Sequence, residues 1–453
     1  MKVENNLGYD DVRQLVWRIA IPSMLAQLVS VLYNIVDRMY IGNIPEIGDI
    51  ALAGVGICGP IVTMIGSFAS LIGIGGSPFM SISMGEQNIK RARAILANCF
   101  LMLCICSVVL MVVLFPFREP MLLLFGASQT ILPYANDYYS IYLMGTIFSL
   151  LSIGLNQFII CQGFAKIGMT SVLLGAILNI IFDPIFIFLF DMGIKGAAIA
   201  TVISQMISCF FILRFLFFAD IPVNITFGEY RWSIIKRVLF LGFTPFIIIA
   251  IDNVMIIVMN MVLQKYGGPQ HGDTLITCAT IAQSFMLVVT MPLGGITGGT
   301  QTILSYNYGA KQFQRVKKAQ RVIFLYCIVY TGLMFLLARI ASPLFIRLFT
   351  QDEELTKQTM WAIQICTLSI IPLGIQYEIV DGFTAIGQVR WSLPLSFFRK
   401  AVYFVSLFIL PMYFEAKSAF YAEPISDFIG PIVSVLVYIF MTKRIFHSQS
   451  EID

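Results

Sequence analysis

Two aspartates lie inside strongly apolar stretches of the sequence. They are Asp37 and Asp183, and Asn179 stands four positions before the second of them, so a helix places Asn179 and Asp183 on one face. Thr201 follows early in the next apolar stretch. Carboxylate, amide and hydroxyl oxygens are hard ligands that suit a small cation such as Na+. The same carboxylates could instead hold a proton, because two like charges repel strongly in a medium of low dielectric. A purely structural ion pair between Asp37 and Arg38 is the alternative.

The composition indicates that membrane-spanning helices position these residues. The chain has 453 residues, 58% hydrophobic and 12% charged, and a mean hydropathy of +0.85, whereas soluble domains carry about 25% charged residues. The apolar runs are long and unbroken, as helices that cross a bilayer require, and lack the short alternating pattern of barrel strands. We therefore predict an all-α polytopic membrane protein with about twelve spans: 15–41, 51–80, 95–117, 136–162, 169–190, 196–218, 238–264, 275–305, 322–341, 358–385, 391–413 and 420–442.

The chain repeats itself. Gly85 recurs as Gly309 and Leu124-Phe125 as Leu348-Phe349, both at a shift of 224 in the numbering, while Pro22 recurs as Pro245 at a shift of 223. The run 163–168 recurs as 382–387 at a shift of 219, which would also relate Gln157 to Gln376. Six spans in each half give both halves the same orientation, as parallel repeats with a cavity between them. We predict an amino-terminal lobe (1–218), a cytoplasmic linker (219–235), a carboxy-terminal lobe (236–442) and a cytoplasmic tail (443–453).

The positions of the charged residues and cysteines predict the membrane orientation and the role of the cysteines. Most Lys and Arg residues fall in the loops that share a face with both termini, so the positive-inside rule predicts cytoplasmic termini. The nine cysteines lie in or beside apolar runs without metal-ligand spacing, and we interpret them as buried apolar residues. We expect no metal site beyond a Na+ at Asp37, Asn179, Asp183 and Thr201. We also expect no cofactor, no nucleic-acid partner and a monomer.

The second half carries intramembrane charges of both signs. They are Asp252, Glu378, Asp381, Arg399 and Lys400, and we interpret them as structural pairs whose signs balance, with ion coupling as the alternative. Asp427, near the start of span twelve, is expected to face lipid headgroups. The shift of 223 places Asn260 opposite Asp37, so this half keeps a polar group but no acid there.

Other residues suggest a cavity and a moving helix. Pro22 removes a backbone hydrogen bond in span one, which predicts a bend that would move Asp37 relative to span five; a static kink is the alternative. The candidate cavity residues are polar or adaptable side chains inside spans, and interhelical contacts are the alternative for each of them: Asn34, Tyr138, Tyr139, Gln157, Asn253, Met255, Gln283, Gln301 and Gln376.

The pattern resembles the multidrug and toxic compound extrusion (MATE) family, in particular its bacterial MepA-like and DinF-like branch. The resemblance covers nearly the whole chain, through the two six-span halves, the basic loops after spans two and eight, and the stretches 33–42 and 179–184. It implies that Asp37, Asn179, Asp183 and Thr201 match the family's amino-terminal cation site. Pro22 matches its bending proline, and Tyr138 or Tyr139 matches a tyrosine near the site. The span-seven glutamate of another branch has no counterpart, although Asp252 and Asn253 lie near that place, which argues against a second ion site.

The resemblance implies an antiporter, driven by H+ or Na+, that exports small cationic or amphipathic organic compounds across the cell membrane by alternating access. A flippase for lipid-linked precursors is the nearest alternative, but it would favour a strongly basic cavity. An intramembrane aspartyl-type enzyme would use Asp37 and Asp183, but a two-lobe duplication has no role in that chemistry. We therefore expect no catalytic site.

Overall fold

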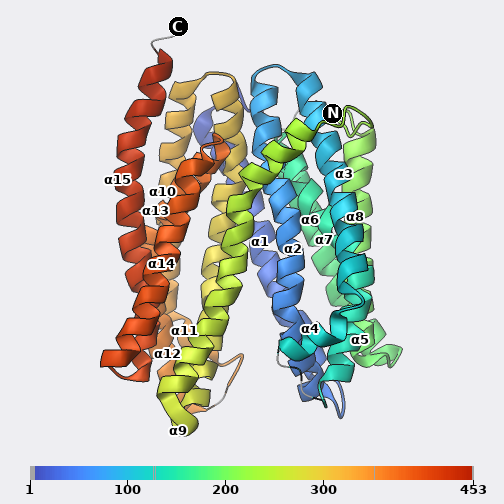
Figure 1. Ribbon diagram of the computed structural model, residues 1–453, viewed down its shortest axis with the longest axis vertical. Helices are drawn as coiled ribbons and strands as arrows, with labels where there is room; N and C mark the ends of the chain where they lie inside the picture. Colours follow the sequence, from blue (N-terminus) through green and yellow to red (C-terminus); the bar gives the residue numbers. More distant parts are fainter. Residues whose placement is uncertain (1–5, 126, 128, 351, 451–453) are drawn as a thin grey trace.

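The computed structural model describes residues 6–450 apart from 126, 128 and 351. In this part of the chain every regular element is a helix (Figure 1). The elements are α1 (Val12–Gly42), α2 (Gly48–Gly85), α3 (Ile89–Leu114), α4 (Arg118–Leu124), α5 (Leu132–Met144), α6 (Thr146–Ile160), α7 (Ala165–Pro184), the π-helix η1 (Ile185–Leu189), α8 (Gly193–Phe218), α9 (Trp232–Gly309), α10 (Phe313–Ile340), α11 (Ser342–Ile346), α12 (Glu353–Cys366), α13 (Ile370–Ala385), α14 (Val389–Tyr413), the 3₁₀-helix η2 (Ala416–Tyr421) and α15 (Ala422–Ser450).

Ten helical segments are long and apolar enough to cross a membrane, and two bent pairs bring the total to twelve. The pairs are α5 with α6, bent by 56°, and α12 with α13, bent by 46°. The helix α9 supplies two spans because Gly268, with a φ of 63°, interrupts it. The predicted all-α class and the prediction of about twelve spans are confirmed.

The two halves lie side by side, with the amino-terminal helices on the right of Figure 1 and most of the carboxy-terminal helices on the left. Matching turns identify equivalent positions. Gln87 and Lys311 both adopt left-handed backbone angles, with φ of 59° and 58°, and Gly163 and Gly387 do so at 91° and 74°. Both pairs correspond to a shift of 224 in the numbering. The match of 163–168 with 382–387 at a shift of 219 was therefore wrong, because the turn requires a positive φ at Gly163 and at Gly387.

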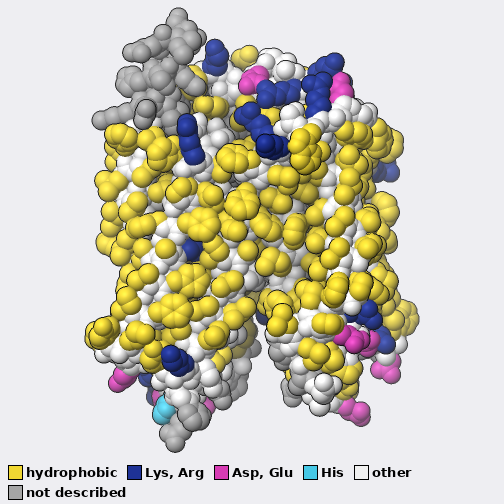
Figure 2. Space-filling view, viewed as in Figure 1, with side chains coloured by type: hydrophobic (Ala, Val, Ile, Leu, Met, Phe, Trp, Pro, Cys, Tyr) yellow, Lys and Arg dark blue, Asp and Glu magenta, His cyan; other side chains and the backbone are white. Residues whose placement is uncertain are grey.

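The halves contact each other near the end of the molecule that carries both termini. The rings of Phe68 in α2 and Phe246 in α9 lie 5.0 Å apart, and Ser81 Oγ donates to the carbonyl oxygen of Thr302 at 3.2 Å. Further towards that end, Gly85 lies against the backbone of the last turn of α9, where a side chain would collide. Figure 2 shows the molecule hollowed between the halves at the opposite end. The two halves therefore form a cleft that is closed on the side of the termini.

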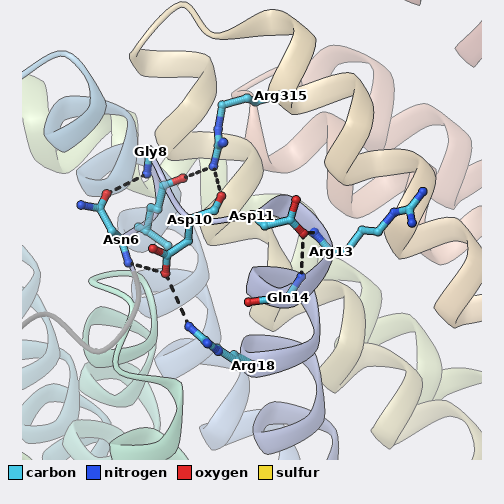
Figure 3. A network of polar contacts seen from close by, with 9 residues as sticks. Asn6, Gly8, Asp10, Asp11, Arg13, Gln14, Arg18 and Arg315 are labelled. Carbon is cyan, nitrogen blue, oxygen red and sulfur yellow. Dashed lines mark hydrogen bonds and ion pairs between the residues drawn. The ribbon is translucent and has the colours of Figure 1, made fainter.

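Residues just before α1 connect the amino-terminal half to the carboxy-terminal half (Figure 3). Arg315 in α10 donates from Nη2 to the carbonyl oxygens of Asp10, at 2.8 Å, and Leu7, at 3.3 Å. Leu7 is buried in a cluster with α9 and α10. Asp11 caps α1, and its other carboxylate oxygen lies 3.5 Å from Lys318 Nζ. These contacts add to the closure at this end.

The surface suits a bilayer. Figure 2 shows a broad apolar band around the middle of the molecule, with Lys and Arg side chains gathered towards the end that carries the termini. Exposed apolar side chains of the spans include Val109 and Val112 in α3 and Leu333 and Leu336 in α10. The band is what a multi-pass membrane protein presents to lipid.

Candidate functional site

Asp37 and Asp183 come together inside the amino-terminal half. Asp37 lies in α1 and Asp183 at the end of α7, and these helices pack against each other. Asp183 is fully buried and Asp37 is 8% exposed. Their carboxyl groups face each other closely enough to interact. Pro184 and the π-helix η1 follow at once, so the regular helical hydrogen bonding changes directly after this carboxyl group.

Asn179 and Thr201 complete this cluster, of which the four-residue spacing predicted that Asn179 lies on the same helix face as Asp183. Asn179 Nδ2 donates to Asp183 Oδ1 at 3.0 Å and approaches Thr201 Oγ1 of α8 at 3.4 Å. Asn179 is buried and Thr201 is half-buried. One amide thus links a helix that carries an acid to the neighbouring helix that carries a hydroxyl group.

Several oxygen atoms of the cluster are buried without a hydrogen-bond partner. They are Asp37 Oδ1, Asn179 Oδ1 and Asp183 Oδ2. All three are acceptors, and a buried acceptor without a donor is costly. A bound proton or small cation would satisfy such acceptors. Because no three His, Cys, Asp or Glu side chains of the described chain come together as a metal site, a metal ion here would have to use the amide and hydroxyl oxygens as well.

Arg38 does not neutralise Asp37 through an ion pair. Both residues are described, yet no contact within salt-bridge distance joins them, and Arg38 is exposed while Asp37 is buried. Arg38 still lies within electrostatic range of the carboxylate. The interpretation of Asp37 as half of a structural pair is therefore not what the geometry shows.

Tyrosines surround the acids. Tyr33 and Tyr138 lie within electrostatic range of Asp37, and Tyr142 lies near both tyrosines and is 3.2 Å from Ser149 through its hydroxyl group. Tyr139 is fully buried beside Cys58 instead. Of the two tyrosines that the resemblance offered, Tyr138 is the one beside the acid.

Sequence reasoning missed Tyr33, Tyr142 and Gln205. Gln205 is a polar neighbour of Tyr142, and its Oε1 is buried without a partner. A simple signal marks all three, since each stands four positions along a helix from a predicted site residue. Tyr33 precedes Asp37, while the other two follow Tyr138 and Thr201.

The candidate cavity residues differ in exposure. Asn34 is exposed, with Nδ2 bonded to the carbonyl oxygen of Ser30 at 2.6 Å. The half-buried candidates are Gln157, Asn253 and Gln283, and the buried ones are Tyr138, Tyr139, Met255, Gln301 and Gln376. Gln376 Nε2 donates to the carbonyl oxygen of Leu395 at 3.3 Å, so it joins two helices of one half. The corrected repeat shift of 224 relates Gln157 to Asp381 rather than to Gln376. A role in substrate binding stays a prediction for this set.

The helix α1 runs through Pro22 without interruption, from Val12 to Gly42. The proline is buried, and the helical segments on both sides of it belong to one element. The predicted bend at this position is therefore not a break in this conformation, and its role in moving Asp37 stays a prediction.

The charges of the carboxy-terminal half form two ion pairs. Lys400 in α14 pairs with Asp252 in α9, and Arg399 Nη1 lies 2.7 Å from Asp427 Oδ1 in α15. Asp427 is fully buried, so the expectation that it faces headgroups was wrong; its charge is satisfied by Arg399 inside the half. Glu378 also departs from the expected balance, because it is buried with both carboxyl oxygens unpaired.

The chain matches known proteins over nearly its whole length. A profile of the MatE family matches residues 22–185 and 249–410, one segment in each half. The multidrug export protein MepA of Staphylococcus aureus (strain MSSA476) is 22% identical over 437 residues, which are 96% of this chain and 95% of that protein. MepA of Staphylococcus haemolyticus (strain JCSC1435) is 23% identical over 430 residues, 94% of this chain and 93% of that protein.

Solved structures share the fold. A structure described as the outward-facing conformation of a multidrug resistance MATE family transporter aligns with a TM-score of 0.90 and 21% identity over 97% of both chains. A MATE structure in the straight conformation aligns with a TM-score of 0.90 and 22% identity, over 97% of this chain and 98% of the other. The fold of this chain is thus shared with these solved structures.

Proposed function

The chain belongs to the MATE family of multidrug efflux transporters, and from that premise we propose that it is a cation-coupled antiporter. It exchanges an inward-moving H+ or Na+ for small organic molecules that leave the cell. One observation carries the proposal: Asp37 and Asp183 face each other in the amino-terminal half with acceptor oxygens unpaired.

Electrostatic repulsion between these two carboxylates couples cation binding to movement of the helices. Two carboxylates at close range repel by several kcal/mol at an effective dielectric of about 20. A bound cation cancels that repulsion and links α1 to α7, and Thr201 extends the link to α8. Release of the cation restores the repulsion. A ligand shifts a conformational equilibrium only if it binds the two states with different affinities. The cation site is divided among three helices, so its affinity changes when these helices move.

The cleft suits the proposed exchange. It is closed near the termini and open at the opposite end. With both termini cytoplasmic, as the distribution of Lys and Arg favours, the open end faces outward. The cation then enters from outside, and its binding favours the rearrangement that opens the cleft to the cytoplasm.

The substrates proposed are small cationic or amphipathic compounds. The relatives are named as multidrug export proteins, and the spans of this chain offer many Met and Phe side chains that adapt to varied apolar shapes. Within the described spans the charged residues are not predominantly basic, as Asp252, Glu378 and Asp381 accompany Arg399 and Lys400. A flippase that holds phosphates would favour the opposite balance. We also propose a location in the cell membrane.

The test is efflux from everted membrane vesicles, driven separately by a Na+ gradient and by a pH gradient. We expect Asp37→Asn and Asp183→Asn to abolish efflux driven by either gradient while leaving the protein level unchanged, because Asn keeps the shape of the side chain without its charge. The matched control is Asp137→Asn in α5, a half-exposed residue 3.4 Å from Lys195, whose surface ion pair contributes little. Normal gradient-driven efflux in both buried variants would place the coupling ion elsewhere.

A further inference from the structure

We propose that two helix faces beside the connection between the halves bind anionic phospholipids in the leaflet on the side of the termini. One face lies at the end of α8 and the other at the start of α9. We call the segment between them, residues 219–231, the strap. The lipid surface is separate from the cluster at Asp37, so it does not depend on the antiport function.

Two carboxamide side chains hold the backbone of the strap against the amino-terminal half. Gln162, just after α6, donates from Nε2 to the carbonyl oxygen of Val223 at 3.0 Å, and its Oε1 accepts from the backbone nitrogen of Val223 at 2.9 Å. Asn98 of α3 donates from Nδ2 to the carbonyl oxygen of Glu229 at 3.2 Å and accepts from the backbone nitrogen of Arg231 at 3.0 Å. The strap and the start of α9 therefore have fixed positions on the amino-terminal half.

The strap also packs through its apolar side chains. Ile221, Val223 and Ile225 are buried in the core of the amino-terminal half. The ring of Phe227 stacks on that of Phe217 in α8, with the centroids 5.9 Å apart, but Phe227 is 75% exposed. The strap thus follows the edge of the amino-terminal half and leaves an aromatic ring at the surface.

Each of the two helix faces beside the strap presents one exposed basic side chain between two exposed aromatic ones. A spacing of four residues places the three members of each set on one face of the helix. The sets are Phe210, Arg214 and Phe218 in α8 and Trp232, Lys236 and Phe240 in α9. This pattern is typical of a helix at the boundary between hydrocarbon and headgroups, because aromatic rings gather at that boundary and a basic side chain extends towards the phosphates.

The two faces lie where the apolar surface ends. The end of α8 and the start of α9 are at the end of the molecule that carries the termini (Figure 1). Figure 2 shows the broad apolar band giving way to Lys and Arg side chains towards that end. Phe218 is the last residue of α8 and Trp232 the first of α9, and each basic residue stands one turn inside. We therefore place both basic residues at the level of the lipid headgroups.

No acid neutralises the two basic side chains. In the part of the chain that the structure describes, neither Arg214 nor Lys236 forms an ion pair. Of the two acids in the strap, Asp220 and Glu229, the second lies 3.5 Å from Lys90 Nζ instead. Basic residues outnumber acidic ones in this region, which favours an anionic partner.

An anionic phospholipid has the chemistry that complements this surface. Its acyl chains suit the aromatic rings on the bilayer side, and its phosphate group suits Arg214 and Lys236. A soluble anion would leave the rings in water, and a zwitterionic lipid would gain less because its headgroup carries an opposing positive charge. One basic residue close to an anionic bilayer surface adds about fivefold to the affinity.

The experiment reads the lipid around Trp232 by fluorescence. The full chain carries phenylalanine in place of its other tryptophans, which are Trp17, Trp361 and Trp391. It is placed in bilayers of equal amounts of phosphatidylglycerol and phosphatidylcholine, with quenching bromine atoms on the chains of one lipid or the other. We expect brominated phosphatidylglycerol to quench Trp232 more strongly than brominated phosphatidylcholine, and Lys236→Gln to reduce this preference by up to about fivefold.

Lys357→Gln is the matched control, because it removes one exposed positive charge from α12 at the opposite end of the molecule. It should leave the preference unchanged. The proposal is overturned if the two brominated lipids quench Trp232 equally, since the surface then selects no headgroup. It is also overturned if neither lipid quenches Trp232, because the surface then lies against another protein or in water.

Native mass spectrometry extends the test to α8 and keeps it decisive if the tryptophan variants do not fold. The otherwise unaltered chain, Arg214→Gln, Lys236→Gln and Lys357→Gln are released from the same mixed bilayers, and the bound lipids are counted. We expect the first two variants to retain less phosphatidylglycerol than the unaltered chain and the control, with phosphatidylcholine unchanged. Equal retention of phosphatidylglycerol in all four proteins would overturn the proposal. None of these results touches the antiport proposal, which depends on Asp37 and Asp183.

Discussion

The two halves of the molecule handle buried charge in opposite ways. In the amino-terminal half, Asp37 and Asp183 bring like charges together with unpaired oxygens around them. In the carboxy-terminal half, Arg399 lies against Asp427 and Lys400 against Asp252. Each acid of these two pairs has a basic partner, whereas buried oxygen atoms of Asp37 and Asp183 lack a partner. The amino-terminal half thus gathers unpaired acids, whereas ion pairs join helices in the carboxy-terminal half.

The residue equivalent to Asp37 in the carboxy-terminal half illustrates this difference in buried charge. Asn260, which the shift of 223 places opposite Asp37, is still polar, and its side-chain oxygen is also buried without a partner. An amide at that position needs no counter-charge, so the neighbouring helices are free of the repulsion that the acid introduces. The charges of this half lie on α9, α13, α14 and α15, where Asp252 pairs with Lys400 and Asp427 with Arg399.

The largest expected effect is on stability, and it differs in sign between substitutions in the two halves. Arg399→Met leaves Asp427 buried without its partner, and we expect the free energy of unfolding to fall by about 3–5 kcal/mol. Asp37→Asn removes a repulsion instead, so its melting temperature should equal or exceed that of the wild type. Thermal unfolding in detergent, followed with a thiol-reactive dye, measures both, because seven of the nine cysteines are buried.

A double variant controls for lost packing. Arg399→Met with Asp427→Leu removes both charges, and we expect most of the stability to return. If Arg399→Met alone melts like the wild type, the pair contributes nothing and the contrast between the halves fails. If the double variant melts as low as the single one, the loss came from shape rather than from charge.

The sequence predicted the spans and the four residues of the amino-terminal cluster because those depend on local signals. Long apolar runs reveal the helices, and acids inside them are rare enough to stand out. It did not predict that Arg399 would meet Asp427, because that contact joins two helices and depends on their rotation. The predicted repeat shift of 219 was wrong for a related reason. The sequences of 163–168 and 382–387 are similar, but the equivalent backbone turns lie at Gly163 and Gly387.

The next effect concerns the contact between the halves and uses two faces of one helix. A Cβ atom at Gly295 would lie 2.6 Å from the carbonyl oxygen of Ser23, whereas one at Gly298 meets open space. We expect Gly295→Ala to destabilise the closed contact by about 1–3 kcal/mol through overpacking. Gly298→Ala should be neutral or slightly stabilising, because alanine favours helix more than glycine does.

Cysteine labelling measures that shift. In a cysteine-free background, a cysteine is introduced at Ser305, which is fully buried and lies 3.3 Å from the Thr302 carbonyl oxygen that Ser81 contacts across the halves. It should react faster with a water-soluble maleimide in Gly295→Ala than in Gly298→Ala. Equal rates in the two variants would mean that this contact does not hold the closed end together.

A smaller effect concerns cation affinity. Thr201→Ala removes the hydroxyl group that Asn179 approaches at 3.4 Å, and one hydrogen-bonding group contributes about 1 kcal/mol. We expect the apparent affinity for the coupling cation to fall about fivefold, with the maximal efflux rate kept. The matched control is Thr384→Ala in α13, whose hydroxyl group bonds only its own helix, at Val380. A larger loss of affinity in the control than in Thr201→Ala would contradict the assignment of the ion site to the amino-terminal half.

The smallest expected effect concerns Asp11 at the start of α1. Its carboxylate is stabilised by its neighbours, whereas Asp37 and Asp183 repel each other. Asp11 accepts hydrogen bonds from the backbone nitrogens of Arg13, at 2.9 Å, and Gln14, at 3.3 Å. These bonds, and to a lesser degree the Lys318 ammonium group, hold the pKa of Asp11 below its ordinary value. A carboxyl group with a lowered pKa in the folded protein stabilises the fold above its unfolded pKa, and that contribution is lost as the pH falls through the folded value.

We therefore expect Asp11→Asn to lower the melting temperature slightly at neutral pH, and the difference from the wild type to shrink as the pH falls below the usual aspartate range, near about 4. Added salt should shrink it as well, because the group is exposed. Lys318→Met, measured in the same way, separates the ion pair from the helix cap: if the cap dominates, its effect is smaller than that of Asp11→Asn. A difference that persists unchanged at acid pH would show that the Asp11 side chain acts through its shape, and that its charge does not help to join the two halves.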